Sequence, residues 1–88
     1  MTLKDYEILK NILDDNDEEI GIVKTKGSTL KEIISRCDKV SYNKVYLTLL
    51  KFESNGWVEH GLARGREKAY ILTDKGIKLL NEIIGGEY

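Results

Sequence analysis

The sequence predicts one α+β domain, over residues 1–88, in which a helix-turn-helix is followed by a basic β-hairpin. The first observation is a capping box formed by Thr29 and Glu32, which opens a short helix that is followed, after a three-residue turn, by a longer one. The second is a pair of short strand patterns on either side of a glycine-punctuated, cationic loop at 61–68. Domains of this length often gain buried surface by oligomerising.

Charge is unevenly distributed along the chain, although the formal net charge is only −1. Residues 1–20 contain two lysines against seven acidic residues, whereas 24–51 contain seven cations against two acids. A basic middle and a basic loop suit a polyanionic partner, with the acidic start turned away from it. The alternative is the mixed charge of an ordinary soluble surface.

Several classes of protein are disfavoured by what the sequence lacks. One cysteine, Cys37, forms neither an internal disulfide nor a zinc site, and its place on an apolar helix stripe suggests a core thiol. No apolar run is long enough to span a membrane and no signal peptide opens the chain, so we expect a cytoplasmic protein. No catalytic constellation or phosphate-binding loop is visible, so we expect no enzyme, cofactor or metal.

The first helix is expected to start after a Thr2 cap and to end near 14–16. The β-branched run at 20–25 predicts a short strand. Apolar residues on this helix and on the last helix form arcs wider than one subunit needs to bury, which favours a homodimer over simple packing of the two helices on each other. The predicted interface residues are Ile8, Ile12, Leu79 and Ile83.

The longest predicted helix, 41–55, organises the rest of the chain. Ser41 provides its N-cap, the Asn55-Gly56 pair ends it, and Val45, Leu49 and Phe52 share a core-facing side. Strands at 57–60 and 69–72 bracket the basic loop, and Thr73 caps a last helix over 74–84. The resulting order of helix, strand, helix, helix, strand, loop, strand and helix is that of a winged helix-turn-helix.

Three segments resemble small winged helix-turn-helix transcriptional regulators of the archaeal, archaeal-virus or plasmid type, with a MarR- or PadR-like core. Residues 45–58 look like the recognition helix running into the first wing strand. Residues 69–76 are similar to the tyrosine–leucine–threonine–x–x–glycine signature that closes the wing, and 61–68 look like the wing itself. The resemblance implies homodimers on duplex DNA, with helix 41–55 in the major groove and the wing on backbone or minor groove. Leu47 and Leu50 depart from the family, in which many members have polar residues there.

The candidate DNA contacts lie on the recognition helix, on the wing and at the start of the Thr29 helix. Asn suits bidentate pairing with adenine, Lys suits guanine or phosphate, and arginine beside glycine suits phosphate or a narrow minor groove. The predicted residues are Ser28, Ser41, Tyr42, Asn43, Lys44, Lys51, Arg64, Arg66 and Lys68.

Two other hypotheses remain from the sequence. The acidic pI of about 5.8 and the apolar Leu47 and Leu50 fit a winged-helix protein-interaction module that does not bind DNA. RNA binding is a third reading, which competition by single strands would reveal. The pattern indicates no small-molecule effector.

Overall fold

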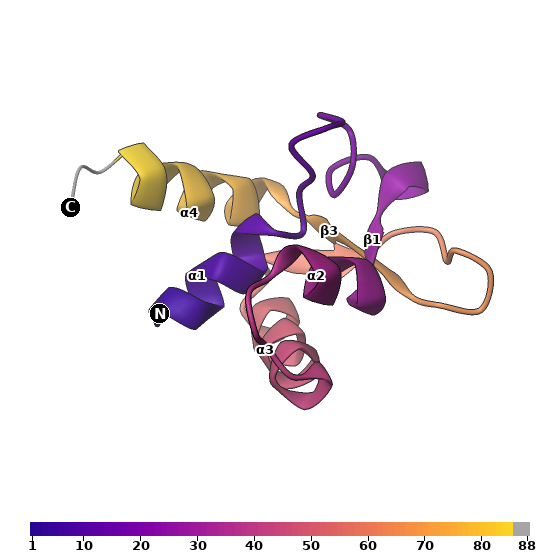
Figure 1. Cartoon of the computed structure of the whole chain (residues 1–88). Helices are drawn as coiled ribbons and strands as arrows, with labels where there is room; N and C mark the ends of the chain where they lie inside the picture. Colours follow the sequence, from indigo (N-terminus) through magenta and orange to yellow (C-terminus); the bar gives the residue numbers. More distant parts are fainter. Residues whose placement is uncertain (86–88) are drawn as a thin grey trace.

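The computed structural model describes residues 1–85, and it confirms the predicted α+β winged helix-turn-helix fold (Figure 1). Within these residues no helix is both long and apolar enough to cross a bilayer. The elements, in chain order, are α1 (Leu3–Lys10), the 3₁₀-helix η1 (Lys24–Lys26), β1 (Ser28–Thr29), α2 (Leu30–Arg36), α3 (Tyr42–Ser54), β2 (Val58–His60), β3 (Ala69–Leu72) and α4 (Asp74–Gly85).

The helix-turn-helix is built by local capping, as predicted. The Thr29 side chain accepts from the Glu32 amide at 3.3 Å, and the Thr29 amide donates to Glu32 Oε1 at 2.9 Å. Ser41 Oγ accepts from the Lys44 amide at 3.1 Å and so starts α3. These bonds satisfy amides that the first turn of a helix leaves without partners, which fixes where α2 and α3 begin.

The end of α3 is a Schellman motif that leads directly into the wing. Gly56 has φ +77°, its amide donates to Glu53 O at 3.0 Å, and the Trp57 amide donates to Phe52 O at 2.9 Å. The Phe52 and Trp57 rings pack with their centroids 5.7 Å apart, the hydrophobic contact that usually accompanies this motif. Only three residues, 55–57, therefore separate α3 from β2.

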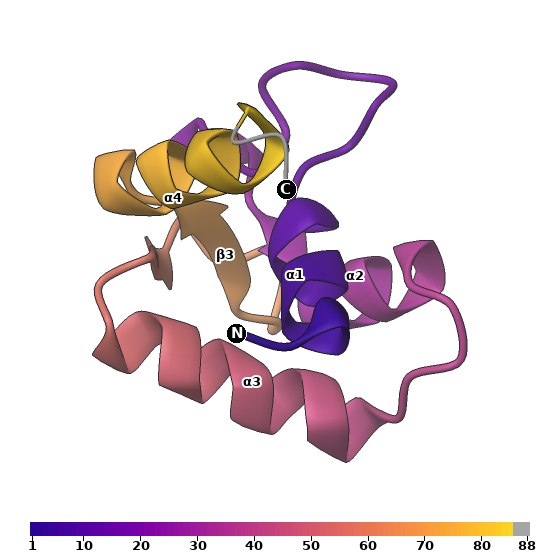
Figure 2. The same ribbon diagram turned by 90° about the vertical axis from the view of Figure 1, so that its left-hand side faces the viewer.

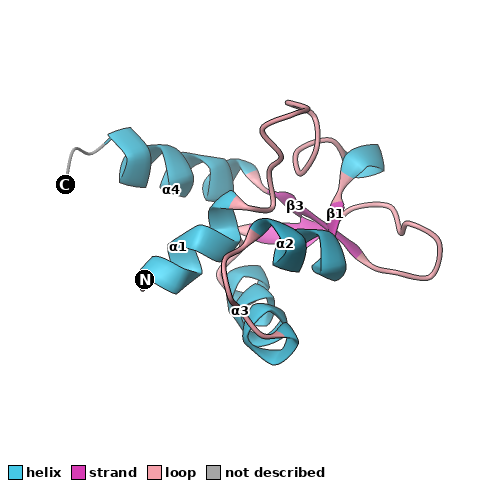
Figure 3. Cartoon of the chain, in the orientation of Figure 1, coloured by secondary structure: helices cyan, strands magenta, loops and turns pink. Residues whose placement is uncertain are grey.

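The sheet has the strand order β1-β3-β2 and is antiparallel throughout (Figure 3). All four residues of the central strand β3 are buried. α1, α2, α3 and α4 enclose a core that includes Ile8, Leu9 and Ile12 of α1 beside Val45, Leu49 and Phe52 of α3. α1 and α4 contact each other at the end of the molecule opposite the wing (Figures 1 and 2).

The strand predicted at 20–25 is wrong, and α1 is shorter than expected. Gly21 has φ +86° and its amide bonds to Lys26 O at 2.8 Å, while the Lys26 amide bonds to Val23 O at 2.8 Å. Turns therefore use the amides of 20–23, while Gly21 O accepts from the Leu72 amide of β3 at 2.7 Å. Ile22 remains 42% exposed. The strand that pairs with β3 on this side is instead Ser28–Thr29, opposite Tyr70 and Ala69.

Candidate nucleic-acid interface

The exposed surface of α3 divides into three rows set by helical periodicity. Val45, Thr48, Leu49 and Phe52 are buried, and they define the inner side of the helix. Glu53 is half-buried, and the exposed side chains fall at three- and four-residue spacing on other sides. We name them the lysine row (Lys44 and Lys51), the tyrosine row (Tyr42 and Tyr46) and the uncharged row (Asn43, Leu47, Leu50 and Ser54).

The lysine row faces α1 and pairs with a buried carboxylate. Lys51 Nζ donates to Asp5 Oδ2 at 2.6 Å, and Lys44 Nζ lies 3.5 Å from Asp5 Oδ1. Asp5 is only 2% exposed, and it also closes the capping box of α1 with Thr2. Asp5 Oδ1 accepts no hydrogen bond from any described residue, so the nearby charge of Lys44 is the main interaction that stabilises this buried oxygen. Both predicted lysine contacts are therefore already engaged within the chain.

Opposing effects act on the pKa of Asp5. Burial alone would raise it, but the Lys51 hydrogen bond, the Thr2 amide and the charges of Lys51 and Lys44 together hold the pKa of Asp5 below its ordinary value of 3.8. The folded state therefore favours the ionised carboxylate.

Protonation of the Asp5 carboxylate should lower the free energy of unfolding in acid. A carboxyl whose pKa is lower in the folded chain binds protons more readily when unfolded, so its stabilising effect is present above pH 4 and is lost as pH falls below about 3.8. Urea unfolding at stepped pH should show the free energy of unfolding decreasing in that range. In Asp5→Asn the decrease should be smaller, and an unchanged acid profile in that variant would contradict the assignment.

A groove separates the tyrosine row from the wing. It encloses about 290 Å³, and Tyr42 and Tyr46 lie on one side of it with Arg66 and Lys68 on the other. Tyr70 of β3 is part of its lining, and burial, with the nearby Glu53 carboxylate, raises the pKa of Tyr70. The groove thus combines aromatic surface with two cations and one acid, Glu67. Aromatic surface beside an excess of cations is suited to a sugar-phosphate chain.

The wing ends in a tight turn that presents Arg66. Arg64 and Glu67 pair across the hairpin through two backbone bonds, of 2.9 and 3.2 Å, which leaves Gly65 and Arg66 as the central residues. Gly65 has φ +68° at the first of these positions, as a type II′ hairpin turn requires. Arg66 therefore lies at the tip of the loop that projects from the sheet in Figure 1.

Arg64 has a different environment from Arg66. Its Nη1 donates to both carboxylate oxygens of Glu32, at 2.8 and 2.9 Å, and to Gly27 O at 3.3 Å. The pKa of Glu32 is lowered: burial acts against this, while the Thr29 amide and the charge of Arg64 favour the ionised form. Arg64 thus ties the wing to the first turn of α2, and its charge is largely neutralised.

Arg66 and Lys68 are the wing cations that stay available. Both side chains are exposed, and neither has an ion pair or hydrogen bond with any described residue of the chain. Glu67, between them in sequence, lies 3.9 Å from Lys31 and lines the same groove as the two cations.

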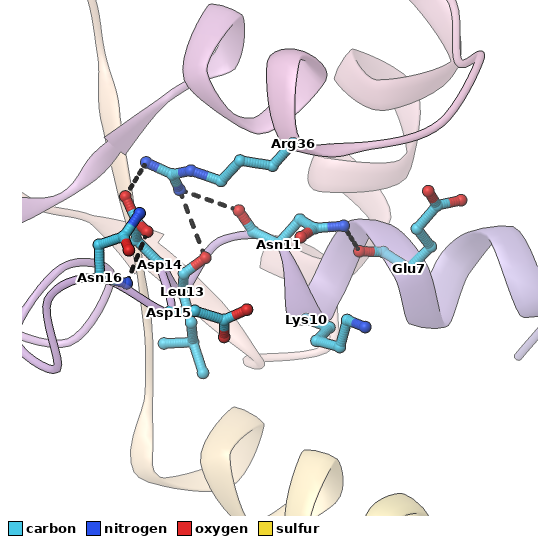
Figure 4. Close-up of a pocket in the computed structure, with 8 residues that line it drawn as sticks. All are labelled: Glu7, Lys10, Asn11, Leu13, Asp14, Asp15, Asn16 and Arg36. Atoms are coloured by element: carbon cyan, nitrogen blue, oxygen red, sulfur yellow. Dashed lines mark hydrogen bonds and ion pairs between the residues drawn. The ribbon is translucent and has the colours of Figure 1, made fainter.

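The prediction that Ser28 contacts DNA is wrong. Its side chain is fully buried, and its hydroxyl donates to Ile12 O at 2.6 Å while it accepts from Arg36 Nη1 at 2.8 Å. Arg36 also donates to Asn11 O at 3.0 Å and so holds the carboxyl end of α1 (Figure 4). The hollow of about 420 Å³ beside it is lined mainly by the acidic and polar residues of 7–16.

Two of the four predicted interface residues are unavailable to a partner subunit. Ile8 and Ile12 are fully buried in the core, where α1 packs against α3 and α4. Their assignment to a dimer interface is therefore wrong. Leu79 and Ile83 of α4 are half-buried. The most exposed apolar side chains on the same terminal helices are Leu3, at 88%, and Ile84, at 58%.

Sequence reasoning missed two residues of this surface. Tyr46 stands one helical turn after Tyr42, so the i, i+4 spacing was a usable signal for the tyrosine row. Asp5 carried no such signal, because its partner Lys51 is 46 positions away. Ser41, Tyr42 and Asn43 are exposed at the start of α3, as expected for contacts at a helix N-terminus.

Comparison with known proteins finds solved structures with a similar fold. No protein-family model and no curated protein matches the sequence. The crystal structure of AF1382 from Archaeoglobus fulgidus is 30% identical, with a TM-score of 0.74 over 97% of this chain and 85% of that one. TubR, a type III plasmid segregation protein, is 20% identical, with a TM-score of 0.69 over 94% of this chain and 73% of its own. A PadR family transcription regulator from Clostridium difficile R20291 is 23% identical, with a TM-score of 0.61 over 93% and 84%.

Proposed function

The chain belongs to the same family of small winged helix-turn-helix proteins as AF1382, and we propose that it binds duplex DNA as a cytoplasmic, non-enzymatic regulator of transcription. The likeness in fold to a PadR family transcription regulator supports this reading. The charge separation expected from the sequence does not support it, because the fold pairs acids of 1–20 with cations of 24–51, as in Asp14 with Arg36 and Asp17 with Lys26.

The observation that carries the proposal is that Arg66 and Lys68, which line the groove beside α3, have no side-chain partner within residues 1–85. With α3 in the major groove, the wing would reach the flanking phosphates or the adjacent minor groove. Phosphate contacts of this kind provide most of the affinity of such proteins, and sequence is read by the helix.

We extend the proposal to a homodimer formed through the terminal helices. Leu3 and Ile84 are exposed there, and Leu79 and Ile83 are half-buried. Exposed apolar side chains gathered on one end of a small domain favour a second copy. Such a dimer would present two recognition helices about 34 Å apart, one turn of B-DNA.

The two wing arginines provide a matched test, because each variant removes one positive charge from the same loop. Arg66→Ala should weaken binding to random duplex DNA and reduce the slope of log affinity against log salt by about 0.9. Arg64→Ala should change that slope by less than half as much, since Glu32 already neutralises its guanidinium, and should instead lower thermal stability. Fluorescence anisotropy across a salt series measures both.

A wild-type slope in Arg66→Ala would mean that the wing tip does not touch phosphate. Leu47 and Leu50, which are 61% and 43% exposed, favour the second candidate function, a protein-interaction module. Absence of duplex binding by the wild type even at low salt would favour that module, and displacement of duplex by single-stranded RNA would favour RNA binding.

A further inference from the structure

The uncharged row is the outermost part of α3, and it carries no ionisable side chain. Asn43, Leu47, Leu50 and Ser54 follow one another at four-, three- and four-residue spacing, opposite the buried side of the helix. All four are exposed, Leu47 to 61% and Leu50 to 43%. Exposing two leucines to water is unfavourable, so this row is best explained by contact with an apolar group on a partner.

Cations flank the uncharged row on both sides. On the α1 side lie Lys44 and Lys51, whose side chains remain 45% and 51% exposed although they pair with Asp5. On the other side, across the tyrosine row, lie Arg66 and Lys68 of the wing. The B-DNA major groove is about 12 Å wide, admits one helix and has a phosphate strand on each side. An uncharged ridge between two sets of cations is complementary to that arrangement.

The side chains of the uncharged row suit A·T pairs better than G·C pairs. Guanine is usually read by a bidentate arginine or lysine, and the uncharged row contains neither. Asparagine pairs with N6 and N7 of adenine, and an apolar side chain contacts the C5-methyl group of thymine. Asn43 and Leu47 are one turn apart on the helix, so they can address neighbouring base pairs.

We propose that Leu47 and Leu50 contact thymine methyl groups and that Asn43 pairs with adenine, so the chain prefers A·T pairs in the major groove. This inference rests on the proposed duplex binding. It differs from a minor-groove preference for A·T tracts, because the recognised group is the methyl of thymine.

Removal of that methyl group is the direct test. Three 24-base-pair duplexes, alternating d(A-T), d(A-U) and d(G-C), would be titrated at one salt concentration with the whole chain. Deoxyuridine lacks only the methyl, so d(A-T) should bind at least about fourfold more tightly than d(A-U), the gain for burying one methyl-sized group. Alternating d(G-C) should bind more weakly than d(A-T).

Variants locate the effect on the protein. Leu47→Ala/Leu50→Ala should bind d(A-T) and d(A-U) equally while keeping the salt slope of the wild type. Ser54→Ala is the matched control on the same row, and it should retain the discrimination. All three substituted positions are exposed, so folding is expected to survive, and circular dichroism checks this.

The outcomes separate the two proposals. Equal wild-type affinity for d(A-T) and d(A-U), with a steep salt dependence, overturns methyl recognition and leaves duplex binding intact. Unchanged discrimination in the double leucine variant also overturns it, since another group must then detect the methyl. Failure to bind any duplex at low salt contradicts the proposed function itself.

Discussion

Gly76→Ala is expected to lower the free energy of unfolding by about 3 kcal/mol, although an alanine inside a helix is normally favoured over glycine by about 1 kcal/mol. A Cβ at this position would lie 2.0 Å from the carbonyl oxygen of Trp57 and 2.9 Å from its carbonyl carbon. Both are backbone atoms, so no side-chain rotation relieves the clash. The steric cost therefore exceeds the gain in helix propensity.

The neighbouring bonds leave little room for α4 to move away. The Thr73 amide donates to Trp57 O at 3.0 Å, and the Thr73 hydroxyl donates to Gly56 O at 2.6 Å while it accepts from the Gly76 amide at 3.0 Å. Shifting the first turn of α4 would break several of these bonds together. This geometry gives a physical reason for a threonine followed three residues later by glycine.

Thermal and urea unfolding followed by circular dichroism measure the effect, with an expected fall in Tm of roughly 12 °C or more. Gly65→Ala is the control: it has φ +68° but nothing within 4 Å of the added Cβ, so only backbone strain of about 1 kcal/mol should appear. If Gly76→Ala is no less stable than Gly65→Ala, the close contact with Trp57 is not a constraint in solution.

Asp5→Asn is expected to strengthen non-specific duplex binding by about tenfold at low salt and to lower stability by about 1–2 kcal/mol. The carboxylate holds Lys51 at 2.6 Å and Lys44 at 3.5 Å, so its loss frees two cations on the helix proposed to enter the major groove. The stability cost arises because the capping box of α1 loses a charged acceptor.

Glu7→Gln is the matched control for Asp5→Asn, because it changes the net charge equally from the same helix. Glu7 pairs with Lys4 at 3.3 Å and accepts from the Asp38 amide at 2.6 Å, so no lysine of α3 is released. Anisotropy titrations should show little change in affinity or salt slope for this variant. Equal gains in the two variants would assign the effect to net charge and not to release of Lys44 and Lys51.

The sequence was most informative where the signal is local. Thr29 with Glu32, Ser41, and Asn55-Gly56 marked the ends of α2 and α3 correctly, because capping depends on residues three or four positions apart. The strand at 20–25 failed because turns bond the amides of 20–23, so the segment meets β3 through Gly21 O and the Leu72 amide without forming a ladder. Strand propensity alone does not reveal such competing turns.

The candidate site was harder to predict, since it depends on which charges meet in the fold. Lys51 and Arg64 look alike as basic candidates in the sequence, yet each is paired with an acid 46 or 32 positions away. Arg66, two residues from Arg64, has no such partner among the described residues. No local pattern distinguishes these cases, so the structure was needed to separate tethering cations from available ones.

The short junction between α3 and the wing has a consequence for the thermodynamics of association. Residues 55–57 are fixed by the Schellman bonds and by α4, so the helix and both wing strands form one preorganised body. Ordering on contact is then confined to exposed side chains and the hairpin tip around Gly65. A preorganised surface of this kind loses little conformational entropy when it docks, and its heat-capacity change reflects interface burial alone, without a contribution from coupled folding.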